Sequence, residues 1–242
     1  MSNTAFRSES SAENQSAGTF SVNKPAGVVD TDLLIAFQAT SVGLGGTAPV
    51  APSGWTIVGT RQSYGSGVGD LVAWWKYANG EGASWMFNNA VGGMSPISCV
   101  NILAFQDAFT QPEGSAKNGV DVIGAGPADS GNYTTLEANE AIAVGWALGT
   151  QAGGTLTPHA SFTALTQLNG GGGMQLRCGH KLAAAAGSVT NNTATIGGGN
   201  TTWGALLVAI ASEAAAPTGL TGWAARRRRS MIPRLLRRLP CQ

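Results

Sequence analysis

Short runs of apolar residues recur along the first 212 residues of the chain, and clusters of Gly, Pro, Asn and Ser separate them. In residues 32–40, Leu33, Ile35, Phe37 and Ala39 occupy alternate positions, so they share one face of an extended strand. Runs of this length between turn-forming residues predict β-strands. The expected strands are residues 18–22, 32–40, 55–64, 70–78, 83–89, 95–108, 141–149, 161–168, 174–183, 187–196 and 202–212.

The strand series predicts an all-β fold. Many of these runs are apolar on both faces, and no helices alternate with them, which disfavours a parallel α/β sheet. We therefore expect an antiparallel two-sheet sandwich, jelly-roll-like, formed by residues 1–212. The segments 41–54 and 110–133 are rich in Gly and Pro and are expected to be long exposed connections. Residues 213–222 are expected to be a linker.

Residues 223–242 differ from the rest of the chain and are predicted to be an anchor tail. Apolar residues there recur with helical spacing and arginines occupy the other side, which indicates a short basic amphipathic helix or an extended tail. Seven helical residues are too few to be stable alone in water, so the segment must dock or stay disordered. The residues expected to bind a partner are Arg226, Arg227, Arg228, Arg229, Met231, Ile232, Arg234, Leu235, Leu236, Arg237, Arg238 and Leu239.

Charge is divided unevenly along the chain. The net charge of +1 combines −6 over residues 1–221 with +7 over residues 222–242, where seven arginines stand without an acid. Charged residues are 11% of the chain, against about 25% in an average soluble domain, and 35 residues are glycine. A composition with few charges and many small residues predicts uncharged surfaces, which are common on shells, fibres and extracellular modules and less typical of metabolic enzymes.

Four fates of the tail are open: a partner protein with an acidic, apolar groove, nucleic acid, a membrane surface, or disorder. We favour the protein groove, because the apolar face would bury area and the arginines would fix the register. Nucleic acid is disfavoured. No membrane insertion is expected, because the longest apolar run has nine residues and a spanning helix needs about 20. The polar N-terminus lacks a secretory signal, so synthesis in a cytoplasm is expected.

The residues that commonly carry chemistry are sparse. His159 and His180 are the two histidines, and Cys99, Cys178 and Cys241 match no metal-ligand spacing. His180 lies two residues after Cys178, yet a metal would need further ligands, so we interpret it as an ordinary strand histidine. The cysteines are expected to be buried free thiols. No metal and no cofactor are expected.

A search for a catalytic constellation also gives little. No Gly-x-Ser-x-Gly elbow occurs, and no phosphate-binding loop follows the Gly-rich segment 169–174. Glu137 and Glu140 could form a carboxylate pair for glycoside cleavage, but two acids in a loop are more often solvated. We therefore expect no catalytic residue and a protein that is not an enzyme.

Three stretches carry a family resemblance: "VNKPAGVVDTDLLIAF" (22–37), "PSGWTIVG" (52–59) and "LVAWWKYAN" (71–79). Their order and spacing resemble the N-terminal half of a β-sandwich module in virion structural proteins of tailed bacteriophages. The closing "GALLVAIAS" is similar to the last strand of that module. Thr31 stands where the module is expected to have Gly, which predicts a different turn. The tail is outside the resemblance, and the resemblance supplies no catalytic residue.

The resemblance implies a non-enzymatic virion protein displayed on the particle as a head decoration, head fibre, minor tail component or tail fibre. A homo-oligomer is expected, with a trimer favoured, and the tail would bind other virion proteins. The matched residues are structural: Trp55 is expected in the core, and Trp74 and Trp75 point to opposite faces, one into the core and one to a surface or subunit interface. The alternatives are a host-glycan-binding adhesin, with an exposed Trp as platform, and a glycan-degrading enzyme.

Overall fold

The computed structural model describes residues 4–16, 18–41, 48–65, 69–89, 97–108, 111–121, 127–135, 138–149, 154–171, 174–197 and 201–212. Within these ranges the secondary structure is entirely β, and every ladder between strands is antiparallel. This confirms the all-β prediction. The expected linker and tail, residues 213–242, lie outside the described residues.

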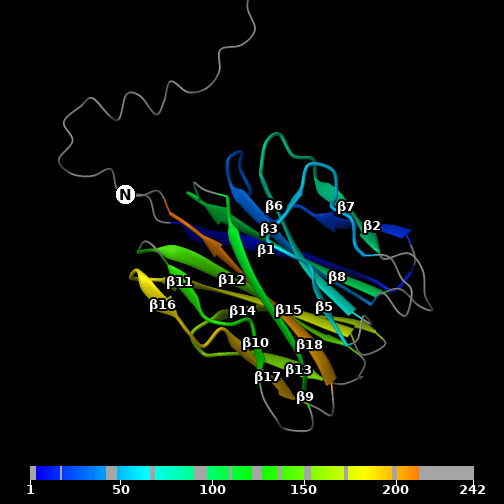
Figure 1. The fold of residues 1–242 in the computed structure, drawn as a ribbon. Helices are drawn as coiled ribbons and strands as arrows, with labels where there is room; N and C mark the ends of the chain where they lie inside the picture. The colour runs from blue at the N-terminus through cyan, green and yellow to red at the C-terminus, as the bar shows by residue number, and fades with distance from the viewer. Residues whose placement is uncertain are drawn as a thin grey trace, which may run out of the picture. The chain divides into compact units, whose positions relative to one another are not determined.

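The first half of the chain forms one large sheet (Figure 1). Its strands run in the order β1, β8, β3, β6, and two short strands, β4 and β5, both pair with β6. The bounds are β1 (Ala5–Asn14), β3 (Leu33–Ser41), β4 (Thr56–Ile57), β5 (Gln62–Tyr64), β6 (Gly69–Tyr77) and β8 (Ile97–Gln106).

The second half forms the other large sheet, in the order β14, β15, β12, β18, β9. The bounds are β9 (Glu113–Asp121), β12 (Glu140–Gly149), β14 (Thr163–Gly171), β15 (Met174–Ala183) and β18 (Thr201–Ile210). Smaller sheets accompany both. They are formed by β2 (Gly18–Asn23) with β7 (Ser84–Asn89), by β10 (Ala128–Asp129), β17 (Thr193–Gly197) and β13 (Thr155–Pro158), and by β11 (Tyr133–Thr135) with β16 (Gly187–Val189).

Three apolar layers hold these sheets together. The central core lies between the two large sheets, and on β3 it receives Leu33, Ile35, Phe37 and Ala39, as the alternation predicts. A first outer core lies under β2 and β7, and a second lies under β10, β13 and β17. Strands β3 and β12 are therefore buried on both faces. The central core also contains Val58, Tyr64, Leu71, Ala73, Ile97, Cys99, Leu103, Phe105, Ala108, Ala141, Ala143, Ala147, Leu165, Leu168, Met174, Leu176, Cys178, Leu206, Val208 and Ile210.

Two edge strands differ from the sequence prediction. The polar segment 5–14 forms β1, and β9 lies inside the segment 110–133 that was expected to be a connection. Edge strands need little apolar surface, and polar residues there discourage pairing with other chains. In β1 the hydroxyls of Ser8 and Ser10 donate to the carbonyls of Ala26 and Asn23. Polar side chains thus join this edge to the turn after β2.

Two expected strands are each divided in two. Residues 55–64 form β4 and β5, separated near Gly59, and residues 187–196 form β16 and β17, separated near Asn191. Both separating residues have left-handed backbone, with φ of 61° and 57°. An extended strand cannot contain that conformation, so the pairing ends there.

The connectivity also differs from the expected jelly-roll order. Each half of the chain completes its own large sheet before the other begins. In a jelly roll, consecutive strands instead alternate between the facing sheets through Greek-key connections. The two facing antiparallel sheets agree with a sandwich.

Candidate functional site

The three stretches that carry the family resemblance converge at one end of the first sheet. The turn before β3 bonds to the turn after β6: Thr31 N–H donates to Ala78 O at 2.8 Å, and Gly80 N–H donates to the Asp30 carboxylate at 2.8 Å. Gly54, in the Pro-x-Gly-Trp turn, lies so close to Lys76 that a Cβ there would be 3.5 Å from Nζ. This convergence of turns is the candidate site.

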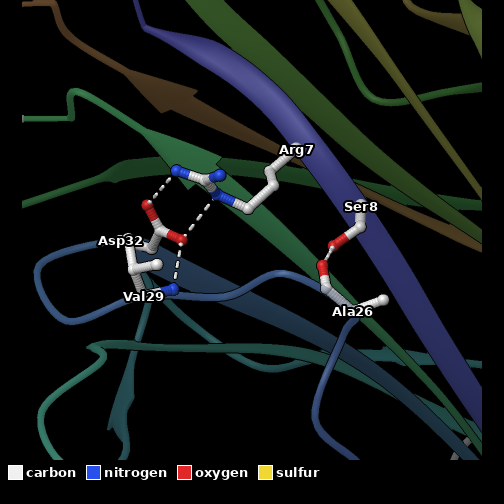
Figure 2. A network of polar contacts seen from close by, with 5 residues as sticks. All are labelled: Arg7, Ser8, Ala26, Val29 and Asp32. Atoms are coloured by element: carbon white, nitrogen blue, oxygen red, sulfur yellow. Dashed lines mark hydrogen bonds and ion pairs between the residues drawn. The ribbon is translucent and has the colours of Figure 1, made fainter.

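An ion pair fixes the first of these turns to the edge of the sheet (Figure 2). Arg7 Nε lies 2.7 Å from Asp32 Oδ2, and Arg7 Nη2 donates to Oδ1 at 3.2 Å, which makes the contact bidentate. Val29 N–H donates to the same carboxylate at 3.0 Å. Because the Asp32 side chain is 3% exposed, these bonds replace its water. The sequence prediction missed this pair, since Arg7 stands in the polar N-terminal segment, where no strand was predicted.

A second carboxylate organises the turn after β6. Glu81 Oε1 accepts from Lys76 Nζ at 2.6 Å and from Asn79 N–H at 3.1 Å, while Oε2 accepts from the Trp85 indole at 2.9 Å. Burial alone would raise the pKa of Glu81, but the hydrogen bonds from Lys76, Trp85 and Asn79 outweigh it and hold the pKa below its usual value. Glu81 therefore stays ionised at neutral pH and is unsuited to act as a general acid.

The carboxylates at this end are thus engaged in holding turns. Asp30, Asp32 and Glu81 each accept a backbone N–H, and the last two also bind a cation. A catalytic pair of acids would need one group that holds a proton at neutral pH and a space between the two for substrate. The arrangement instead stabilises the geometry of the turns.

An aromatic cluster lies beneath these turns in the first outer core. Trp55 is 5% exposed, which confirms its predicted place in the core. Its ring meets Trp85 edge-on with centroids 5.4 Å apart, and Phe87 at 5.8 Å. Edge-to-face contacts of this kind add to the area that the rings bury. The Trp in the Pro-x-Gly-Trp turn therefore fixes the turn to the β7 cover.

The adjacent tryptophans point to opposite faces, as predicted. Trp74 is 4% exposed in the first outer core, and its indole donates to Gln38 Oε1 at 3.0 Å. Trp75 packs partly buried against the central core and meets Tyr77 edge-on at 5.8 Å. The large apolar side chains that are exposed in the described ranges are Val29, Val50, Ile57, Met86 and Leu182, none of which is aromatic.

The other singled-out residues are dispersed. Cys99 and Cys178 are buried free thiols, as predicted. Burial raises the pKa of Cys99 to about 12, with Glu13 adding to it, and burial raises that of Cys178 well above its usual value. Neither forms a thiolate nucleophile at neutral pH. Cys241 lies outside the described residues.

The histidines occupy two unrelated places. His159 follows β13 in a turn, where its Nδ1 contacts the Ser161 hydroxyl at 3.0 Å. His180 stacks on Phe6 with centroids 4.0 Å apart, and burial lowers its pKa although Glu9 partly offsets this. Across the described ranges, no group of three or more His, Cys, Asp or Glu residues could hold a metal ion.

The two acids that were considered and disfavoured as a carboxylate pair are only half described. Glu140 opens β12 and is 3% exposed, while Glu137 lies outside the described residues. The anchor residues of the tail lie outside them as well. In the described part of the chain, no helix is long and apolar enough to cross a membrane.

Comparison of the chain with protein-family models, with curated proteins and with solved structures finds no match. The functional argument therefore depends on the residues themselves.

Proposed function

We propose that this protein is a non-enzymatic structural component of a tailed-phage virion. It is displayed on the particle surface as a head decoration, head fibre, minor tail component or tail fibre, and it is a homo-oligomer, with a trimer favoured. The observation that carries the proposal is the division of charge: residues 1–221 have a net charge of −6, and residues 222–242 have seven arginines and no acid. Two parts of opposite charge suit two different surroundings.

The described body supports a structural role. The carboxylates at the convergence of turns are held in ion pairs and backbone hydrogen bonds, and both described thiols are buried. The exposed face of the β2 and β7 ribbon bears Thr19, Ser21, Asn23, Ser84 and Met86. Apart from Met86 these residues are small and polar, and an uncharged face of this kind suits a surface that remains in solvent or contacts neighbouring subunits.

The tail is the proposed attachment. As a short helix or an extended segment, it would place Met231, Ile232, Leu235, Leu236 and Leu239 in an apolar groove of another virion protein. The seven arginines would pair with acids around that groove. Because such a helix is marginal alone, attachment and ordering would occur together.

Incorporation into particles tests the proposal. Phage propagated with a chain ending at residue 212 should assemble without this protein, whereas the full chain should be found in purified particles by immunoblot. Two tail variants separate the contributions of charge and apolar area. One replaces the seven tail arginines with glutamine and keeps the apolar residues, and the other replaces the five apolar residues with serine. We expect both to reduce incorporation. Normal incorporation of the truncated chain would refute the attachment.

Immunogold electron microscopy of particles with the full chain would then locate the protein. Gold over the head would identify a decoration or head fibre, and gold at the tail would identify a tail component. Particles that carry no label would refute the virion proposal itself.

A further inference from the structure

The two halves of the chain have the same strand order. The first large sheet runs β1, β8, β3, β6, β5, and the second runs β9, β18, β12, β15, β14. In each half the first strand lies at one edge, the last strand is beside it, and the strand opened by a buried acid is central. The covers match as well, because β2 pairs with β7 and β10 pairs with β17. The large sheet and its cover are therefore built in the same strand order in each half. The halves differ in their short strands, since β4 pairs with β6 while β13 pairs with β17, and the β11–β16 pair belongs to the second half.

The residue that precedes the central strand is also the same in conformation. Thr31 has φ of 80° and precedes Asp32, which is 2% exposed, while Asn139 has φ of 64° and precedes Glu140, which is 3% exposed. Left-handed backbone is uncommon outside glycine, so its recurrence at one place in both halves is informative. Each of these residues donates its N–H to an alanine at the end of the strand that lies beside the central strand in the sheet, β6 in the first half and β15 in the second. The bonds are Thr31 N to Ala78 O at 2.8 Å and Asn139 N to Ala183 O at 2.7 Å.

The pairing registers agree residue by residue. If Leu33 is matched to Ala141, both central strands pair without a bulge to the strands on either side. Lys76 then falls at the position of Lys181, one residue before Tyr77, the partner of Leu33, and Leu182, the partner of Ala141. The pairs of Leu33 are Tyr77 and Phe105, and those of Ala141 are Leu182 and Ile210.

Contacts between the large sheets are reciprocal. Strand β8 packs on β15 and β14, and their counterparts β6 and β5 pack on β18, the counterpart of β8. Along the sides of the sandwich, β1 contacts β14 just as β9 contacts β5. In an interface with two-fold symmetry, each contact between a strand of the first half and a strand of the second half recurs between their counterparts. The two halves are therefore related by an approximate two-fold axis.

Residues close to such an axis must meet their own counterparts, and one pair does so. Phe37 corresponds to Gly145, and a Cβ on Gly145 would lie 2.6 Å from the Phe37 ring. At the ends of the halves, Ala108 forms an isolated antiparallel bridge with Ser212, which is one residue short of its register counterpart. Two phenylalanines could not occupy the first place, so the pair combines one large residue with one that has no side chain.

We infer that the chain is a tandem duplication of one β-module, residues 4–108 and 111–212, and that the inner face of each module is a docking surface for a second copy of that module. The large sheets then form an internal pseudo-dimer, and each small sheet is the outer cover of its own module. The inference is independent of the proposed virion role.

The first test separates the modules in the full chain. A protease site with flanking Gly-Ser residues is inserted between residues 108 and 111, and the uncut variant is the control. After cleavage the two fragments should elute together at the mass of one chain, separate in urea and reassociate on dilution. A complex of two identical fragments, distinguished by mass spectrometry, would mean that modules from two chains pair through the same faces, which also supports the inference. Fragments that separate or aggregate without denaturant would overturn it.

The second test exchanges the pair on the axis. Gly145→Phe alone and Phe37→Gly alone should each lower the urea midpoint of unfolding, the first through overpacking and the second through a cavity. The double variant places the large residue on the other module and should recover at least half of the larger loss. Losses that simply add in the double variant would contradict the two-fold relation, even if the cleaved fragments stay together.

Discussion

Replacing Gly204 by alanine should destabilise the sandwich through a single clash. Gly204 lies on β18 beneath the ring of Tyr64, which is 2% exposed on the short strand β5. A Cβ on Gly204 would lie 2.7 Å from Tyr64 Cδ1 and 3.2 Å from Cε1, closer than carbon atoms can approach without movement. The ring cannot move far, because Gly69 and Gly149 are also close to it: a Cβ on either would lie within 3.0 Å of Tyr64.

The magnitude follows from two opposing effects. Forcing an extra methyl group into a packed core costs about 1–3 kcal/mol. Alanine in a strand gains about 0.5–1 kcal/mol over glycine, because the unfolded chain loses less freedom. We therefore expect Gly204→Ala to lower the free energy of unfolding by about 1–2 kcal/mol, or the melting temperature by about 4 °C in a domain of this size.

Urea unfolding followed by tryptophan fluorescence measures this loss, and a double-mutant cycle assigns its cause. In a Tyr64→Leu background the smaller side chain leaves room for the methyl group, so Gly204→Ala should cost less than about 0.5 kcal/mol there. Gly82→Ala is the matched control, because no atom lies within 4 Å of the added Cβ. A Gly204→Ala protein as stable as the parent, or an unchanged cost in the Tyr64→Leu background, would refute the clash.

Three further changes test other features of the fold. Thr31→Gly should stabilise the protein by up to about 1 kcal/mol, because a β-branched residue is strained at φ of 80°. Asn139→Gly should change the stability less, since Asn tolerates φ of 64°. Equal effects of the two changes in urea unfolding would contradict this. Arg7→Met would leave Asp32 buried without its cation and should lower the free energy of unfolding by about 2 kcal/mol. This is below the roughly 3–5 kcal/mol of a fully buried pair, because Arg7 is 27% exposed. A loss under about 0.5 kcal/mol by thermal melting would show that water replaces the guanidinium. Burial raises the pKa of Tyr64, so the stability that its neutral hydroxyl contributes is complete below about pH 10 and is lost as pH rises further. Tyr64→Phe should therefore lose less stability than the parent between about pH 10 and 11. Identical losses in the two proteins would argue against a buried hydroxyl.

The central strands were predictable because burial determines their composition. Residues 33–41 and 97–106 lie between a central and an outer core, so both of their faces are apolar and the runs are unmistakable. The core position of Trp55 followed from the turn before it. The opposite orientations of Trp74 and Trp75 followed from the two-residue period of a strand.

The edges and the polar contacts could not be predicted in the same way. Strand β1 consists of partly exposed polar residues, and its pairing with β8 depends on backbone hydrogen bonds that leave no pattern in the sequence. Arg7 and Asp32 are 25 residues apart, so only the fold brings them together. Thr31 stands where the resemblance expects Gly, which predicted a different turn; the backbone there nevertheless has the left-handed conformation that glycine suits.

The duplication escaped sequence reasoning for a physical reason. Where the two copies meet at Phe37, the packed interior has no room for a second phenylalanine, so the copies differ there. Phe37 and Gly145 are such a pair, and Thr31 and Asn139 keep only their conformation in common. Packing therefore removes sequence identity between the two copies at positions near the axis. Strand order and register persist, because hydrogen bonds between backbones do not depend on side chains. A repeat of this kind is visible in the pairing of strands, and a search for repeated letters will pass over it.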